Sequence, residues 1–358
     1  MKKLYITITI LSLFMAACNK ENTGSGSSSV PSTYSFANVN YSGQTFRISM
    51  LEEMLDYAIT GRTIGTTVDA SVLKNMFSNT GSPFTDTILN TCGKQLKNKC
   101  FVIDQPLYES YMDSLALASL NPGAGSNGIA GVVTSTIDPL KKYLLSANGW
   151  DYTELIEKGL MGGVFYYQAI NSYLENLAFD DNLTLVPGEG TAMEHHFDEA
   201  FGYFGVPVNF PTNTTDVVFW GEYCNDLDAV LNTNHNMMKS FVRARYAISK
   251  KDYSMRDAEV NSIRENWDEL VAAAAIHEIN ESLAYFSDDA LRNHTLSEFV
   301  GFVSCLKYSL YAKATTAEIN TIIGYIGIDL YNVTVMNLNA AKNALSSIYG
   351  LDSVKDIL

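Results

Sequence analysis

The sequence predicts an all-α protein: a helical bundle, built either as one large domain or as two packed four-helix-like bundles. Apolar residues recur with helical spacing in most segments, residues typical of helix ends bound these segments, and the loops between them are mostly short. The sequence shows no pattern typical of a parallel sheet. Because 47% of the 358 residues are hydrophobic, the chain can bury a substantial core.

Helix-end signals place the elements of the first half. Gly61 is of the type favoured just past a helix end, and Asp69, Asp104 and Asp151 can each begin a helix. The glycine-rich stretch 123–131 contains Gly-x-Gly-x-x-Gly, but it follows no strand and lacks Gly-Lys-Ser/Thr, so we interpret it as a flexible connection. We expect helices over 46–60, 70–78, 104–118, 132–147 and 151–178, and short strands at most around 34–41.

The second half is predicted to be helical as well, apart from a break at 205–211 and a weakly helical stretch over 212–232. Ser254 is a candidate N-cap, and Thr295-Leu-Ser-Glu298 has the form of a capping box that opens a helix. His294, just before this box, is interpreted as a hydrogen-bond partner of the helix start. The expected helices cover 191–205, 233–249, 254–285, 295–313, 316–326 and 334–349, the last of them ended by Gly350.

The N-terminus predicts an envelope lipoprotein. A basic start, a short apolar run and Met15-Ala-Ala-Cys18 are typical of a signal peptide over residues 1–17, followed by a cysteine that is acylated. Residues 18–33 are expected to form a flexible tether, and residues 34–358 the all-α domain, which would divide near 190 if it holds two bundles (about 34–190 and 191–358). The predicted location is the Gram-negative cell envelope, on the periplasmic or surface face of the outer membrane, with the bilayer as partner through the lipid on Cys18.

Charge and cysteine content narrow the classes of partner. The formal net charge is −15, and it becomes −17 once residues 1–17, with Lys2 and Lys3, are removed. Such a surface disfavours nucleic acid and anionic lipid head groups, and it concentrates cations nearby. Cys92 and Cys100 are near enough in sequence to pair in an oxidising compartment, whereas the other cysteines have no spacing typical of a zinc site.

Residues 191–205 concentrate the chemistry of the chain. On a helix, the apolar residues of this stretch share one stripe, and acidic and histidine side chains flank it. A carboxylate beside an imidazole can fix its tautomer or join it as a metal ligand. Gly202 lies opposite the apolar stripe, which predicts close approach by another backbone. The candidate ligands are His196, Glu199, Glu194, Asp198 and His195.

This stretch resembles the signature of the imelysin family, bacterial envelope proteins tied to iron uptake. His196-Phe-Asp-Glu199 matches the His-x-x-Glu of the family motif, and Phe201-Gly-Tyr-Phe-Gly205 resembles its aromatic tail. The sequence departs from the family at Glu194, where the motif has glycine, and by one extra residue before Gly205. The resemblance implies two four-helix bundles with a polar cleft between them.

A second pair, His277 and Glu281, shares one stripe of the long helix expected over 254–285. By itself this pair is typical of a satisfied hydrogen bond between helices, and it is a more speculative contributor to the same cleft.

Three functions follow as hypotheses. The first is an imelysin-like lipoprotein that binds a divalent metal ion, or an iron-containing ligand, in the cleft; imidazole with carboxylates suits zinc or iron better than calcium. The second is a structural or surface-interaction lipoprotein in which the cluster is a buried polar network. The third is a metal-dependent hydrolase, which is disfavoured because His-Glu-x-x-His and Gly-x-Ser-x-Gly are both lacking in the sequence, and no catalytic residue is assigned.

Overall fold

The computed structural model describes residues 29–358; the predicted signal peptide, Cys18 and most of the tether lie outside the described residues. The all-α prediction is confirmed, and Pro31–Leu358 forms one compact unit. None of its described helices is long and apolar enough to span a membrane. The helices are α1 (Ser42–Ile59), α2 (Ala70–Ser78), α3 (Thr87–Thr91), α4 (Gln105–Ser119), α5 (Tyr152–Leu160), α6 (Leu174–Asn176), α7 (Ala192–Gly202), α8 (Trp220–Asp226), α9 (Asp228–Leu231), α10 (Thr233–Lys250), α11 (Tyr253–Ala284), α12 (Asp289–Cys305), α13 (Thr316–Ile326) and α14 (Val335–Tyr349).

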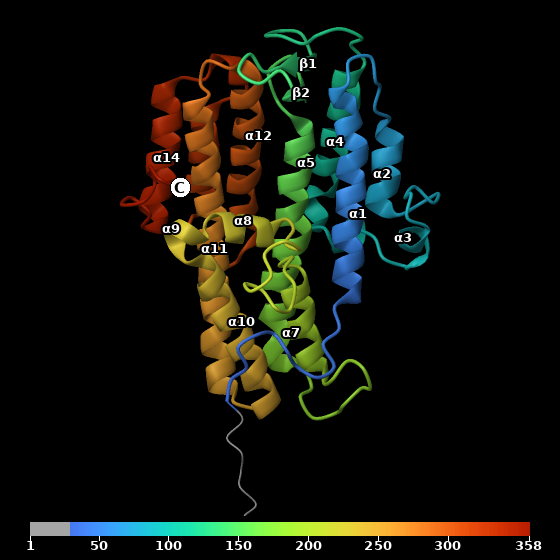
Figure 1. Cartoon of the computed structure of the whole chain (residues 1–358), viewed down its shortest axis with the longest axis vertical. Helices are drawn as coiled ribbons and strands as arrows, with labels where there is room; N and C mark the ends of the chain where they lie inside the picture. The colour runs from blue at the N-terminus through green and yellow to red at the C-terminus, as the bar shows by residue number, and fades with distance from the viewer. Residues whose placement is uncertain (1–28) are drawn as a thin grey trace, which may run out of the picture. The chain divides into compact units, whose positions relative to one another are not determined.

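Packing of long helices organises the unit. Helix α5 packs against α12 and against α1 and α4, while α11 packs against α10, α12 and α14 (Figure 1). Buried aromatic rings fill the centre, where Trp267 contacts Trp220, Phe204 and Phe241 at centroid distances of 6.3, 4.8 and 6.4 Å. Such large rings contribute most of the apolar area that holds these helices together.

The prediction of a helix over 132–147 is wrong, because this segment forms an antiparallel hairpin. Strand β1 (Gly131–Thr134) pairs with β2 (Lys142–Leu145), with Gly131 opposite Leu145 and Thr134 opposite Lys142. Pro139 lies in the connecting loop, where its lack of an N–H costs nothing. The loop is fixed to α12 by Asp288, whose Oδ2 accepts hydrogen bonds from the hydroxyls of Ser135 and Thr136 and from the Thr136 and Ile137 N–H groups. The strands expected around 34–41 do not form.

Helix α12 begins six residues before the predicted capping box. Asp288 is its N-cap and accepts from the Leu291 N–H at 2.9 Å. The Thr295 hydroxyl instead bonds back to the Leu291 carbonyl, and Glu298 contacts Lys158. Both residues therefore lie inside the helix. Similarly, α11 is capped by Asp252 and not by Ser254.

The segment 151–178, which was expected to form one α-helix, consists of successive α-helical, π-helical and 3-10 helical turns. After α5, residues Met161–Tyr166 and Gln168–Tyr173 are π-helical. A Cβ on Gly162 would lie 2.3 Å from the Cys305 Sγ, so this glycine is required for the close approach of α12. The widened turns leave the Met161 carbonyl free to accept from the Trp220 Nε1–H at 2.9 Å.

Candidate functional site

A polar cavity of about 560 Å³ lies where the N-terminal ends of α5 and α12 meet α8, the C-terminal part of α11 and the hairpin loop. Eight carboxylates line it against three lysine or arginine side chains, together with two histidines. Walls of one dominant sign attract ligands of the opposite charge. The acidic residues are Asp138, Glu154, Glu157, Glu222, Asp226, Glu278, Glu281 and Glu298, the basic ones Arg62, Lys141 and Lys158, and the histidines His277 and His294.

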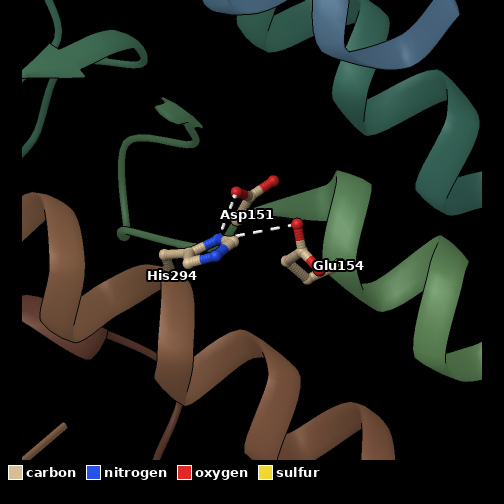
Figure 2. Close-up of side chains that lie close together, drawn as sticks. All are labelled: Asp151, Glu154 and His294. Carbon is tan, nitrogen blue, oxygen red and sulfur yellow. Dashed lines mark hydrogen bonds and ion pairs between the residues drawn. The ribbon is translucent and has the colours of Figure 1, made fainter. Parts of the chain in front are cut away.

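Three side chains converge beside this cavity. Asp151 caps α5 through Oδ1, Glu154 lies in the first turn of α5, and His294 projects from the first half of α12 (Figure 2). The His294 Nδ1 lies 3.1 Å from the Asp151 Oδ2 and 3.6 Å from the Glu154 Oε1. Among residues 29–358, this is the one group of three or more His, Cys, Asp or Glu whose ligand atoms all lie within 4.8 Å of one another.

The group is held rigidly. The Asp151 N–H donates to the Ser297 Oγ at 2.9 Å, which ties the start of α5 to α12. The His294 ring stacks on the Tyr143 ring of β2, with centroids 3.9 Å apart and planes 19° apart. Stacking on one face and an acceptor at Nδ1 together fix the orientation of the imidazole.

Arg62, just after α1, supplies positive charge to the group. Its Nη2 lies 2.8 Å from the Glu154 Oε1 and 3.6 Å from the Asp151 Oδ2. The Arg62 side chain is 26% exposed, whereas those of Asp151 and Glu154 are 0% and 5% exposed. The guanidinium can therefore turn toward solvent, while the two carboxylates cannot.

Lys158 carries the second positive charge, one turn further along α5. Its Nζ lies 2.6 Å from the Glu157 Oε1, 3.0 Å from the Glu298 Oε1 and 3.3 Å from the Glu154 Oε2. Burial raises the pKa of Glu278, as do the negative charge of Glu298 and the hydrogen bond between the two side chains. Burial opposes ionisation of Glu298 too, but Lys158 and His294 outweigh it and hold the pKa of Glu298 below its usual range.

Two members of the converging group have raised pKa values. Burial raises the pKa of Glu154 to about 8, despite the opposing charges of Lys158 and His294. Burial lowers the pKa of His294, but the negative charges of Glu154 and Glu298 and the hydrogen bond to Asp151 outweigh it, so the net shift is upward. Near neutral pH the site thus holds protons that a bound cation would displace.

Of the residues predicted on 191–205, Glu194 and Asp198 take part in a structural network. Glu194 and Thr191 form a capping box at the start of α7. The buried Arg245 of α10 donates to the Glu194 Oε1 at 2.7 Å and to the Asp198 Oδ1 at 2.8 Å, and the Tyr34 hydroxyl donates to the same Asp198 oxygen at 2.6 Å. Burial raises the pKa of Asp198 to about 6, although Arg245 opposes the shift.

The histidines of this stretch diverge. His196 pairs with Asp180 at 2.8 Å and its side chain is 40% exposed. The His195 Nε2 lies 4.0 Å from the Glu199 Oε2, and the Glu199 Oε1 accepts from the Gln44 side chain at 2.9 Å. Gly202 is approached closely, but by a side chain and not by the predicted backbone: a Cβ there would lie 2.6 Å from the Tyr41 Cβ at the start of α1. The α7 residues thus do not converge on one point.

His277 and Glu281 do reach the cavity, where they share its wall with His294. Sequence reasoning identified Asp151 only as a cap, read His294 as a partner of a helix start, and did not single out Glu154. One signal was available: His294 and Glu298 repeat the i, i+4 spacing of His277 and Glu281. Cys92 and Cys100 do not form a disulfide bond in the structure, and their thiols contact nearby backbone carbonyls.

A family model described as "Domain of unknown function (DUF4856)" covers residues 31–351, nearly the whole described chain. No curated protein and no solved structure matches the sequence.

Proposed function

The chain belongs to the DUF4856 family, whose description assigns no activity, and we propose from the cavity itself that it is a lipid-anchored envelope protein that binds a divalent cation at Asp151, Glu154 and His294. The observation that carries the proposal is the convergence of one imidazole and two carboxylates, with all ligand atoms within 4.8 Å of one another, beside a cavity with an acidic wall.

The donor set suits a transition-metal ion. An imidazole with two carboxylates is typical of zinc or ferrous iron, whereas calcium sites are usually built from oxygen ligands alone. Asp151 is completely buried and serves as a helix cap, so its position is fixed before any ion arrives. Glu154 and His294 also line the cavity, from which water or an iron-bearing ligand would complete the coordination of a bound ion.

The lipid anchor and the kinship to imelysins belong to the same proposal. Met15-Ala-Ala-Cys18 supports acylation of Cys18, and His196-Phe-Asp-Glu199 supports a distant relation to envelope proteins of iron uptake. In this protein, however, the site we propose lies on α5 and α12, away from the stretch that carries the resemblance.

A purely structural role is the second candidate, and Arg62 favours it. With Arg62 at 2.8 Å from Glu154 and His294 at 3.1 Å from Asp151, the two carboxylates already have partners. In that case the group would be a buried polar network that joins α1, α5 and α12.

Calorimetric titration of the full chain with Zn²⁺, Fe²⁺ and Ca²⁺ separates the two candidates. We expect one ion per chain, with zinc and ferrous iron bound more tightly than calcium. Arg62→Ala should raise the affinity about tenfold, because it removes the internal cation that competes for Glu154. Arg243→Ala, a change at a surface ion pair of α10, is the matched control and should change nothing. Negligible uptake by both wild type and Arg62→Ala would exclude cation binding and leave the structural role.

Metal affinity is expected to rise with pH between about 6.5 and about 8, by up to about tenfold per pH unit for each proton released. Glu154 and His294 both have raised pKa values, so in this window the folded protein holds protons that the unfolded chain has lost. The metal-free protein should therefore lose stability as the pH rises, and a bound ion should offset that loss. Titrations in buffers of different ionisation enthalpy count the released protons; an affinity independent of pH would contradict the assignment.

A further inference from the structure

Exposed apolar side chains gather on the loop between α6 and α7. Phe179, Leu183, Leu185 and Val186 are 87%, 74%, 69% and 45% exposed. Single exposed apolar residues are normal on a soluble protein, but four within eight residues of one loop form a patch that calls for a partner.

Two acidic residues of this loop, Asp180 and Asp181, have partners close by. Asp180 pairs with His196, and the Asp181 carboxylate accepts from the Leu183 N–H at 2.8 Å and the Thr184 N–H at 3.3 Å. Asp181 is exposed like the apolar side chains, but backbone N–H groups of the loop itself engage its charge.

A basic turn lies next to the loop. The Asn182 side chain donates to the Ile248 carbonyl at 2.9 Å, which places the loop beside the end of α10 and its Lys250 and Lys251. Tyr253, the first residue of α11, is 41% exposed. Apolar side chains flanked by lysines and an amphipathic ring are the composition that suits the boundary between head groups and acyl chains.

The chain enters the folded unit at this same end. The Tyr34 N–H donates to the Val208 carbonyl at 2.9 Å, and the Ala37 carbonyl accepts from Arg245 of α10. In Figure 1 the segment 31–41, the loop before α7 and the turn between α10 and α11 all lie at the lower end, opposite the β-hairpin. The twelve residues 19–30 between Cys18 and this entry point can span at most about 40 Å.

We propose that the loop 179–186 docks into the surface of the bilayer that carries the lipid on Cys18, with Lys250 and Lys251 against phosphate head groups. The inference rests on the lipid anchor of the proposed function, because a short tether brings this end to the membrane first. Docking would hold the folded unit upright, with the cation cavity at the far end.

The test uses the full chain, acylated at Cys18 and reconstituted into vesicles of phosphatidylethanolamine and phosphatidylglycerol. An environment-sensitive dye is attached to Leu185→Cys in a Cys92→Ser background, since the other cysteines of the folded unit are buried. The matched control is Leu140→Cys in the hairpin loop, which is 90% exposed but lies at the opposite end. We expect spin-labelled lipids to quench the dye at position 185 several-fold more than the dye at position 140.

Flotation of the same samples reports anchoring separately. Chain that floats with the vesicles but shows equal quenching at both positions would overturn docking while the anchor stands. Chain that does not float would overturn the anchor and the docking that rests on it. Dye protection at position 185 that depends on protein concentration and needs no lipid would mean that a second copy of the chain covers the loop, which also overturns the proposal.

Discussion

His294→Asn is expected to weaken binding of Zn²⁺ or Fe²⁺ at least about a hundredfold. The change removes the imidazole nitrogen that lies 3.1 Å from Asp151 and 3.6 Å from Glu154, and two carboxylates without a nitrogen donor hold these ions poorly. Asparagine can still hydrogen-bond to Asp151, so the junction between α5 and α12 should survive. Calorimetry measures the affinity, and a thermal melt of the same sample verifies the fold.

His196→Asn is the matched control for this prediction. His196 also pairs with an aspartate, at 2.8 Å, but it lies on α7 and away from the cavity. Its replacement should leave metal affinity unchanged. Unchanged binding in His294→Asn, or an equal loss in both variants, would place the ion elsewhere. Glu154→Gln provides an independent check, since it removes one ligand charge at nearly constant volume.

Arg245→Met is expected to lower the free energy of unfolding by about 3–5 kcal/mol without a change in metal affinity. Arg245 is completely buried and pairs with Asp198, which is equally buried, and with Glu194. Methionine fills a similar space but leaves the two carboxylates without their cation. Chemical denaturation monitored by tryptophan fluorescence measures the loss.

Arg243→Met, on the same helix, should cost less than about 1 kcal/mol, because Arg243 is 39% exposed and its ion pair with Glu259 is reached by solvent. Similar costs for the two variants would mean that the α7 network contributes little to stability. A loss of metal binding in Arg245→Met alone would instead connect α7 to the cation site.

Local chemistry predicted the helices whose ends are set by their own side chains. Asp69 caps α2, which ends at Ser78 as expected, and the bounds of α13 are those predicted. The prediction failed over 132–147, where helical apolar spacing was followed across Pro139 although an interior proline breaks a helix. At the start of α12 two capping patterns compete, and only packing against α5 and the hairpin decides for Asp288.

The site was less predictable than the fold for a physical reason. His294 and Asp151 are 143 residues apart in sequence, and no local pattern indicates that the start of α5 meets the first half of α12. The metal ligands were predicted on residues 191–205 because the charged residues of this stretch are neighbours in sequence. Adjacent residues on a helix diverge, however, and here His196 pairs with Asp180 while Glu194 and Asp198 share Arg245. Of the predicted candidates, His277 and Glu281, one turn apart on α11, line the polar cavity, whereas His196 and Glu199 do not.

The π-helical turns after α5 fix the rotational phase between the two ends of the molecule. Each residue advances an α-helix by about 100°, so deletion of one residue from 161–173 would rotate everything downstream by roughly that angle relative to Asp151 and Glu154. Tyr166 and Tyr173 would then leave their present neighbours, and the segment leading into the loop before α7 would emerge from another face. The π-helical turns therefore set the rotation of the helix between α5, which contacts α12, and the later segment, which leads to α7.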